Sequence, residues 1–513
     1  MWKLNLIFLF LAMTNCLSAQ PGTLDPSFNI SGTVTTTFVS GQDAGRSIAI
    51  QPDGKIIVAG STYTSGTFYT YDFAICRYET DGTLDQSFGS NGKVTTDFYG
   101  YDEEAKCLAI QDDGKILVAG YSYDFPNASI DFAMVRYLTN GNIDSSFGLN
   151  GKVLTFFDGD AMANSIVIQT DGKIILAGMS RYLLGDQDFG MVRYKSDGSI
   201  DSTFGLYGIT RTDFTSGSED NAYAMALQSD GKIVLAGETR LSPSPDFNFA
   251  IVRYETDGDP DASFGNSGKV IANFGQNKDE IFAVAIQEDQ KIIVTGKTGS
   301  DFSNDFGMIR YNTNGTPDPS FGFSGRVNSP GKGTMRSILI QPDSNIVVAG
   351  ELNSNFTLYR YHFNGTIDST FGTFGQVLTS ITGSDVGHSI ALQDDGKLVL
   401  AGTGNNTFAV ARYYSGINTS VVDQVNSNAE PVIFPNPAVN SLFFEYHLSQ
   451  NSPVDLELFD ADGKLVQSIL HNETRTAGIH REQFTFQRGT RGGNYFLILK
   501  TGTGIVTRKI LKF

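Results

Sequence analysis

Two short acidic clusters are the residues in this sequence best suited to chemistry. Asp102, Glu103 and Glu104 stand together, and Glu219 and Asp220 form a second cluster. A pair of carboxylates about 5–10 Å apart can act on a glycosidic bond without any sequence motif. A polysaccharide-active hydrolase or lyase is therefore one hypothesis for this chain.

Sequence motifs of other catalytic classes are absent. The chain has no G-x-S-x-G, no H-E-x-x-H and no phosphate-binding loop. The only histidines between residues 20 and 414 are His362 and His388, and each departs from the repeat pattern at its position. His388 precedes an expected inner strand and could face a channel mouth, although a lone histidine is more often structural. The residues thus favour a protein without catalysis and leave the enzymatic hypothesis open.

Aromatic residues gather in the most variable segments of the first third of the chain. Rings in such positions can stack on sugars or fill pockets on a protein partner. The simpler alternative is that they cover their own loops. These candidate ligand-binding residues are Tyr63, Phe68, Tyr69, Tyr71, Tyr101, Tyr121, Tyr123, Phe125 and Tyr182. Recognition of a glycan or a protein is the leading hypothesis.

A repeated turn, Asp81-Gly82-Thr83-Leu84-Asp85 in its second copy, raises the question of calcium. Carboxylates spaced along a turn suit this cation, but a site needs six or more oxygen ligands. Asn replaces the first Asp at Asn140, Asn314 and Asn364. Because Asp and Asn define turns without metal, we expect no cofactor here, with calcium at Asp81 and Asp85 as the alternative.

The elements that must position these residues come from a sequence that recurs seven times. Its copies are AIQPDGKIIVAG from Ala49, AIQDDGKILVAG from Ala109, VIQTDGKIILAG from Val167, ALQSDGKIVLAG from Ala226, AIQEDQKIIVTG from Ala285, LIQPDSNIVVAG from Leu339 and ALQDDGKLVLAG from Ala391. An apolar run, an Asp-Gly turn and a β-branched run together predict a β-hairpin.

Two further landmarks accompany each hairpin. D-x-[ST]-F begins at Asp25, Asp85, Asp144, Asp201, Asp261, Asp318 and Asp368, and Arg-Tyr begins at Arg77, Arg136, Arg193, Arg253, Arg310, Arg360 and Arg412. Self-similarity at this period indicates an array of units that bury their faces against one another. We expect each Arg to reach a carboxylate, such as that of the D-x-[ST]-F Asp, and each Tyr to pack between units.

Each unit contains four strand-like runs, which we name A to D in chain order. In the second unit they are Cys107–Gln111, Lys115–Gly120, Asp131–Leu138 and Lys152–Phe157. Four antiparallel strands per unit and seven units predict an all-β fold, a seven-bladed β-propeller over residues 20–414. The first unit starts late and the last lacks a D strand, so residues 33–38 should complete the last blade.

The predicted propeller has one monotonous face and one variable face. The A–B and C–D turns repeat, whereas the B–C and D–A connections differ in every blade, including Ser61–Tyr71, Tyr121–Ile130, Glu238–Asn248, Gly100–Glu104 and Ser216–Asn221. Segments without packing duties can carry function. We therefore expect any binding site on the face of the B–C and D–A connections, near the channel mouth.

The repeats resemble the delta-60 repeat family of bacterial surface proteins. The resemblance rests on S-F-G-x-x-G-K-V, I-Q-x-D-G-K-I-x-V-A-G and D-F-x-x-x-R-Y across residues 22–414, with the widest departure in the sixth unit, at Ser344-Asn345 and at 328–330. It implies a propeller-like domain and brings no activity with it.

The last part of the chain has a different texture. Residues 415–430 are polar and predict a linker, and residues 431–513 alternate as in a small β-sandwich. The latter segment is similar to the C-terminal sorting domain of the type IX secretion system of Bacteroidota, through its Pro-Asn-Pro start, central Asp-Gly-Lys turn and basic, apolar end. This similarity implies contact with that secretion machinery and delivery to the exterior or the outer-membrane surface.

Composition narrows the remaining possibilities. Residues 1–19 read as a secretory signal peptide, and the sequence predicts no transmembrane segment in the mature chain. The formal net charge of −18 excludes nucleic acid as an expected partner.

After signal cleavage only Cys76 and Cys107 remain as cysteines. Both are expected as buried thiols, with a bridge between them as the alternative. A purely structural surface component is the third functional hypothesis.

Overall fold

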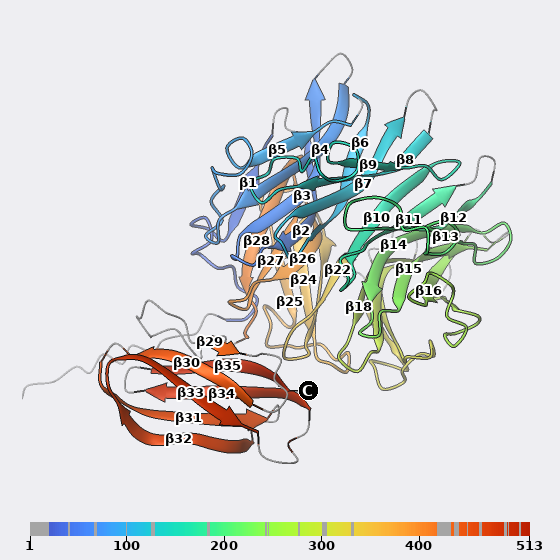
Figure 1. Ribbon diagram of the computed structural model, residues 1–513. Helices are drawn as coiled ribbons and strands as arrows, with labels where there is room; N and C mark the ends of the chain where they lie inside the picture. The colour runs from blue at the N-terminus through green and yellow to red at the C-terminus, as the bar shows by residue number, and fades with distance from the viewer. Residues whose placement is uncertain are drawn as a thin grey trace, which may run out of the picture. The chain divides into compact units, whose positions relative to one another are not determined.

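A computed structural model describes two compact units of this chain, the first ending at Ile417 (Figure 1). The described residues are 20–38, 42–65, 69–98, 100–124, 129–181, 185–241, 244, 246–274, 278–299, 305–329, 333–417, 432–434, 441–448, 450–460, 464–486, 490, 492–501 and 504–512. The expected signal peptide and residues 418–430 of the expected linker lie outside them. No helix within the described part of the chain has the length and apolar character needed to cross a membrane.

Seven four-stranded antiparallel sheets make up the described part of the first unit, which confirms the predicted seven-bladed propeller. The first blades are β2 (Asp43–Ile50), β3 (Ile56–Ser65), β4 (Tyr69–Tyr78) and β5 (Lys93–Thr96); β6 (Glu103–Ile110), β7 (Ile116–Asp124), β8 (Ser129–Tyr137) and β9 (Lys152–Thr155); β10 (Ala161–Ile168), β11 (Ile174–Arg181), β12 (Gln187–Tyr194) and β13 (Ile209–Thr212). The next are β14 (Glu219–Leu227), β15 (Ile233–Arg240), β16 (Phe247–Tyr254) and β17 (Lys269–Ala272); β18 (Glu280–Ile286), β19 (Ile292–Thr298), β20 (Asp305–Tyr311) and β21 (Arg326–Ser329); β22 (Thr334–Ile340), β23 (Ile346–Leu352), β24 (Asn355–Tyr361) and β25 (Gln376–Thr379).

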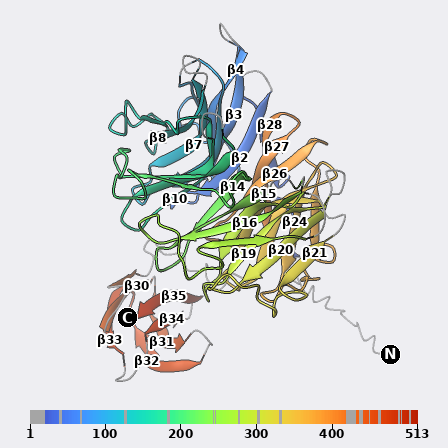
Figure 2. The same ribbon diagram turned by 90° about the vertical axis from the view of Figure 1, so that its right-hand side faces the viewer.

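The last blade combines the two ends of the propeller sequence. Its strands are β26 (Asp385–Leu392), β27 (Lys397–Gly404), β28 (Thr407–Tyr414) and β1 (Thr33–Thr36). β1 pairs antiparallel with β28, with Thr33 opposite Ala411 and Thr36 opposite Phe408. The first blade, in blue, therefore lies beside the last, in orange (Figure 1, Figure 2). The N-terminal strand closes the ring.

The Asp-Gly turn shapes the A–B hairpin in the way the sequence suggests. In the first blade Gly54 has φ +81° and donates its N–H to Gln51 O over 2.8 Å, while Lys55 N donates to Asp53 Oδ1 over 3.1 Å. Glycine adopts this left-handed conformation without strain, and aspartate bonds its own backbone two residues on. Gln290 and Ser344 occupy the glycine position of two blades with φ +64°.

An arginine ladder links each blade to the next. In each blade the Arg of Arg-Tyr donates from Nε to the D-x-[ST]-F Asp over 2.7–2.9 Å, as Arg193 does to Asp201. Its Nη1 donates to a backbone carbonyl of the following blade, for example from Arg193 to Thr256 O over 2.7 Å. The Tyr is buried in every blade, and in six blades it bonds a D-strand hydroxyl, as in Tyr78 Oη to Thr36 Oγ1 over 2.7 Å. Tyr311 has no such partner among the described residues. These side chains are structural.

Every innermost strand carries a β-bulge at the same place. In β2 the register shifts between Gly45 and Ser47, so Arg46 is the extra residue. The glycine that ends each V-A-G run faces this bulge, and a Cβ added to Gly60 would lie 1.8 Å from Ala44 O. Only glycine leaves room for that carbonyl, because it has no Cβ. All seven blades share this bulge, so the extra residue of each innermost strand faces the equivalent residues of the neighbouring blades at the centre of the propeller.

The second unit is a small β-sandwich, as predicted. One sheet contains β29 (Val432–Phe434), β30 (Ser441–Leu448) and β33 (Gly478–Thr485), and the other β32 (Leu465–Arg475), β31 (Ser452–Asp460), β34 (Gly493–Thr501) and β35 (Gly504–Lys512). Their inner faces share one core that includes Phe444, Leu456, Leu497 and Ile510.

Several expected loop boundaries were wrong, because the strands near the variable face run further than expected. Tyr63 pairs with Tyr71 and Tyr123 with Ile130 inside the B–C hairpins. Glu103 begins β6 and Glu219 begins β14, where loops were expected. Tyr, Thr and Ser are polar enough to read as loop yet pair well in strands. At the C-terminal end of the first unit, Ser415, which was expected in the linker, is buried.

Candidate functional site at the channel mouth

The seven bulged residues form the innermost layer of the propeller. They are Arg46, Lys106, Asn164, Tyr223, Phe282, Arg336 and His388. Neighbours in this ring touch: Arg46 contacts His388, the ring of Tyr223 packs 5.4 Å from Phe282, and Arg336 lies over Phe282 at 5.2 Å. Because this position differs in every blade, the layer is chemically uneven around the ring.

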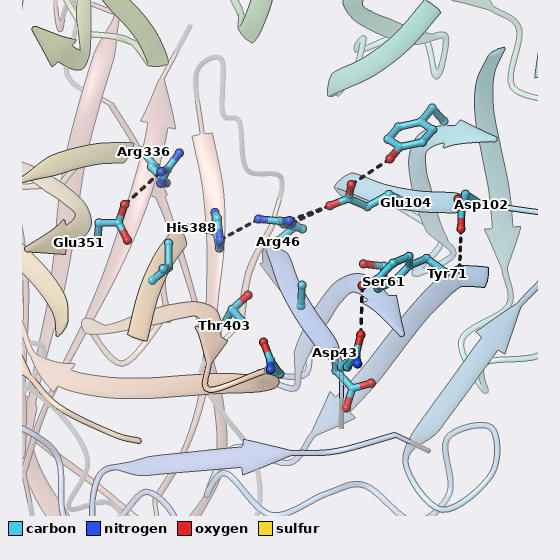
Figure 3. A pocket seen from close by; sticks show the side chains of 15 residues that line it. Asp43, Arg46, Ser61, Tyr71, Asp102, Glu104, Arg336, Glu351, His388 and Thr403 are labelled. Carbon is cyan, nitrogen blue, oxygen red and sulfur yellow. Dashed lines mark hydrogen bonds and ion pairs between the residues drawn. The ribbon is translucent and has the colours of Figure 1, made fainter. Parts of the chain in front are cut away.

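A pocket of about 680 Å³ opens over one side of this layer (Figure 3). Residues of the sixth, seventh, first and second blades line it. They are Gln42, Asp43, Ala44, Arg46, Ser61, Tyr71, Asp102, Glu104, Tyr121, Arg336, Glu351, Val386, His388, Thr403 and Asn406. Many of these lining residues lie at the ends of A and B strands, next to the D–A and B–C connections. This is the face on which the sequence predicts binding.

Glu104 holds the pocket's largest charge network. Its Oε1 accepts from Arg46 Nε over 2.9 Å, and its Oε2 accepts from Tyr121 Oη over 3.2 Å and pairs with Lys106 Nζ at 2.6 Å. Burial opposes ionisation of this carboxyl, but Lys106 and Arg46 outweigh it and lower the pKa of Glu104. Burial, and then Glu104, raise the pKa of Tyr121. Glu104 is therefore a fixed anion.

His388 extends the network into the last blade. Arg46 Nη1 lies 3.0 Å from His388 Nε2 (Figure 3). Arginine has no acceptor, so Nε2 must accept this hydrogen bond, which places the proton of the neutral ring on Nδ1. Burial, followed by Arg46, Arg336 and Lys106, holds the pKa of His388 well below its usual range. His388 is a neutral donor into the site.

Arg336 and Glu351 form a separate pair on the opposite side of the pocket. Arg336 Nη2 donates to Glu351 Oε1 over 3.1 Å. Arg336 Nε is buried and has no hydrogen-bond partner among the described residues. This arginine retains one donor that the surrounding protein does not use.

The other half of the inner layer includes two aromatic residues, Tyr223 and Phe282, and contacts an acidic side chain outside the layer. Tyr223 Oη donates to Glu238 Oε1 over 2.8 Å, and Asn221 Nδ2 donates to the same oxygen over 3.1 Å. Burial and then the charge of Glu280 raise the pKa of Glu238 above its usual range. Sequence reasoning missed Glu238 as a titrating group.

Of the nine aromatic candidates, the structure places two in the pocket lining. Tyr71 and Tyr121 line it; Tyr71 is 38% exposed and its N–H donates to Asp102 Oδ1 over 3.1 Å. Tyr63 packs on Tyr71 with ring centroids 5.2 Å apart, and Tyr101 packs on Tyr123 at 6.3 Å. Tyr69 lies in β4. Phe68, Phe125 and Tyr182 lie outside the described residues.

The acidic candidates do not come together as one pair. Asp102 and Glu104 line the pocket. Glu103, the first residue of β6, is buried away from the pocket lining, and Ser122 Oγ donates to it over 3.3 Å. Glu219 pairs with Arg240, and Asp220 is buried and accepts from Phe214 N over 2.8 Å. Strand alternation separates adjacent acids onto opposite faces.

The Asp81 and Asp85 turn is satisfied by protein groups. Asp81 Oδ1 accepts from Thr83 N over 2.9 Å, and Asp85 accepts from Arg77, Lys55 and Ser87. Two other groups of described carboxylates have ligand atoms within 4.8 Å of one another, namely Asp72, Asp97 and Glu103, and Asp188, Asp213 and Asp220. Calcium binding at Asp81 and Asp85 stays a prediction.

The sequence signal for the site was the variable position just before the small residue of each A strand. The column after it holds only small residues, while this one reads Arg, Lys, Asn, Tyr, Phe, Arg and His. Of the seven, the sequence argument singled out His388 alone. Arg46 and Arg336 lacked any repeat or motif to mark them.

Family comparisons agree with both units. A model described as a domain of unknown function (DUF5122) β-propeller matches residues 51–88, 111–147, 169–204, 228–264, 287–321 and 341–371, and one described as a secretion system C-terminal sorting domain matches 432–512. The chain contains DUF5122 β-propeller repeats and a secretion system C-terminal sorting domain. The sorting domain directs this protein to the secretion machinery and to the outer-membrane surface or the exterior.

Three solved structures similar to this protein are distant in sequence. PorZ, a surface component of the type IX secretion system of Porphyromonas gingivalis, is 12% identical with a TM-score of 0.41; the alignment covers 90% of this chain and 58% of PorZ. Virginiamycin B lyase from Staphylococcus aureus is 14% identical with a TM-score of 0.44, covering 74% and 98%. The propeller of the Trilobed protease from Pyrococcus furiosus is 11% identical with a TM-score of 0.40, covering 74% and 94%. No curated protein sequence matches the chain.

Proposed function

We propose that this surface-delivered propeller is an adhesion-like binding protein that recognises a glycan or a protein at its channel mouth. The observation that carries the proposal is the pocket of about 680 Å³, where four neighbouring blades contribute different side chains to one opening. A repeated scaffold with one varied, concave, polar and aromatic surface is the arrangement expected of a recognition site.

The pocket's chemistry supports recognition over catalysis. General acid catalysis needs a carboxyl that is protonated near the working pH. Lys106 and Arg46 instead keep Glu104 ionised, and Glu351 is paired with Arg336. Paired charges with fixed geometry, next to the rings of Tyr71 and Tyr121, suit the binding of hydroxyl groups and ring faces.

The test uses the chain from residue 20 onward and a panel of soluble polysaccharides, with calcium and then with a chelator. Bound ligand and polymer length are both measured. We expect binding without shortening, and at least a tenfold loss of affinity in Tyr71→Ala or Tyr121→Ala, since truncating a central aromatic contact costs about 1–2 kcal/mol or more. Tyr207→Ala is the matched control, because Tyr207 is 79% exposed on a C–D connection.

Each other outcome favours a named alternative. Shortening of the polymer would contradict the proposal and support a hydrolase or lyase. Self-association of the purified chain without any ligand would support a structural surface component. Equal affinity of Tyr71→Ala, Tyr121→Ala and Tyr207→Ala for a bound ligand would place binding elsewhere. If no polysaccharide binds, the same three variants are compared for capture of a protein partner at the cell surface.

A further inference from the structure

Three carboxylates converge where the third blade meets the fourth, outside the lining of the channel-mouth pocket. Asp188 is in β12, Asp213 follows β13, and Asp220 is in β14, a strand that packs against β12 (Figure 1). Oxygen atoms of the three carboxylates lie within 4.8 Å of one another. None of the three forms a salt bridge with a lysine or arginine among the described residues. Their negative charges are therefore close together and not paired.

The connection between these strands contains more acceptor oxygens than donors. Ser218 is fully buried there, and its Oγ lies 2.9 Å from Asp213 Oδ1, 2.9 Å from Asp220 Oδ2 and 2.8 Å from Thr215 O. A hydroxyl group carries one hydrogen, so Ser218 donates to one of these three oxygens at a time. The remaining oxygens stay close to one another without a hydrogen from Ser218 between them.

Asp220 also carries a buried oxygen that no donor reaches. The residue is 0% exposed; its Oδ2 accepts from Phe214 N over 2.8 Å, whereas its Oδ1 has no hydrogen-bond partner among the described residues. Thr239, opposite Asp220 in the β14–β15 register, has a buried and equally unpartnered Oγ1. Burial raises the pKa of Asp220 to about 6, and the nearby Thr239 partly offsets this rise. In the first blade the equivalent Thr62 donates directly to Asp43 Oδ1 over 2.6 Å.

The next junction, between the fourth and fifth blades, satisfies the same positions without charge. Asn248, like Asp188, precedes the buried phenylalanine of its C strand, and Asn273, like Asp213, follows its D strand. Asn273 Nδ2 donates to Asn248 Oδ1 over 2.7 Å. Two amides supply a donor and an acceptor, whereas two ionised carboxylates supply acceptors only. The acidic junction therefore needs a positive partner that the amide junction does not need.

We propose that Asp188, Asp213 and Asp220 bind a calcium ion that links the third blade to the fourth. The available ligands are all oxygens, which suit a hard cation, and calcium takes six to eight of them. The three carboxylates, through one or both oxygens, and water supply that number. The ion offsets the repulsion among the carboxylates and the surplus of acceptors. This site is distinct from the Asp81 and Asp85 turn, and the inference does not depend on the proposed function.

The test measures calcium binding by the chain from residue 20 onward. Calorimetry gives the affinity, and thermal unfolding is followed in EDTA, in calcium and in magnesium. We expect a Kd of about 0.1–1 mM, the range of calcium sites in extracellular modules. The melting temperature should rise with calcium concentration, because a ligand that binds the native state stabilises it. Magnesium should act more weakly, since it demands near-ideal octahedral geometry and gives up its water reluctantly.

A double variant, Asp188→Asn with Asp213→Asn, copies the amide pair of the next junction. It should fold in EDTA and bind calcium about tenfold or more weakly, since the number of charged ligands sets calcium affinity. Asp213→Asn alone is a second test and should also weaken binding. The matched control is Asp112→Asn with Asp394→Asn, which removes the same two charges from exposed A–B turns. The control should bind calcium as the unchanged chain does.

The outcomes decide whether the ion occupies this junction. Equal calcium affinity of the double variant and the control would overturn the proposal, as would an unchanged chain that binds no calcium. Loss of binding in Asp97→Asn, with the double variant unaffected, would place the ion in the carboxylate group of the first blade instead. Loss in Asp81→Asn alone would place it in the repeated turn. Equal effects of magnesium and calcium would contradict the assignment of calcium.

Discussion

Arg412 donates a hydrogen bond from Nε to Asp25 Oδ2 over 2.8 Å, although 387 residues separate the two. The same arginine reaches Thr80 O in the first blade through Nη1. Six other arginine–aspartate pairs link residues that are only eight positions apart. The pair of Arg412 and Asp25 is thus the same contact that recurs in every blade, but here it joins the two ends of the propeller sequence.

Asp25→Asn should therefore destabilise the propeller and loosen its closure. Asp25 is fully buried, which opposes ionisation, but hydrogen bonds from Ser27 and then the charges of Arg412 and Lys397 hold its pKa well below the usual range. Removing the charge leaves the buried Arg412 without its counter-ion, which costs about 3 kcal/mol. Urea unfolding measures this loss, and limited proteolysis of the N-terminal segment reports on closure.

Asp201→Asn is the matched control for closure. It breaks the equivalent bond to Arg193 inside one continuous blade, where burial opposes but Thr203 and Arg193 lower the pKa of Asp201 to about 2. We expect a similar loss in urea but no increased cleavage near the N-terminus. Equal cleavage of both variants would contradict the special role of the Asp25 contact.

The carboxylates between β12 and β14 should make stability fall as the pH rises. Burial, then Asp213, Asp220 and Asp186, raise the pKa of Asp188 to about 6 from an ordinary value of 3.8. The native state then binds more protons than the unfolded state between about pH 4 and pH 6, so deprotonation across this interval lowers stability. Asp188→Asn should raise the melting temperature at pH 8 and leave it almost unchanged at pH 4.

Asp394→Asn controls for the loss of one negative charge, because Asp394 lies exposed in an A–B turn. The change in melting temperature that Asp394→Asn causes should be similar at pH 4 and at pH 8. A pH-independent gain in Asp188→Asn would show that packing, and not repulsion among the carboxylates, is responsible.

Cys76 and Cys107 should be unreactive thiols in the chain from residue 20 onward. Cys76 and Cys107 are free and buried, and burial raises the pKa of Cys76 to about 12. A thiol reagent needs access to the thiolate. We expect no reaction of the native chain with a disulfide reagent and two equivalents after denaturation without reductant. An unreactive denatured chain would instead indicate a bridge between them.

Cys107→Ser should fold normally. Aligned blades carry serine at this position, and Ser47 Oγ accepts from Leu108 N over 3.2 Å in the neighbouring blade. The hydroxyl would find a comparable partner in Ala119 O, which lies 3.6 Å from Cys107 Sγ. A large loss of stability in urea would show that the sulfur itself is required for packing.

The fold could be predicted because its determinants are local and repeated. The Asp-Gly turns, the β-branched runs and the Arg-Tyr and Asp landmarks specify each blade, and Arg193 and Asp201 meet as their spacing suggests. The truncated first and last units also indicated that residues near Thr33 pair near Ala411. Sequence periodicity is sufficient when every unit repeats the same contacts.

The candidate site was less predictable, because it is assembled across blades by an irregularity. The bulge at Arg46 reverses the inside–outside alternation of β2, so a period of two counted from Ser47 places Arg46 wrongly. The contact between Arg46 and His388 joins residues 342 positions apart, and the equivalent neighbours in other blades, such as Tyr223 and Phe282, are of different residue types. Contacts that occur once leave no repeat to read.

The most direct test of a ligand site at the channel mouth is amide hydrogen exchange of the full chain with and without a polysaccharide that binds. Our account predicts slower exchange in the segments around Arg46, Glu104 and Tyr121, with no change in the C–D connections around Leu206. Protection confined to the C–D connections, or to the second unit, would contradict it.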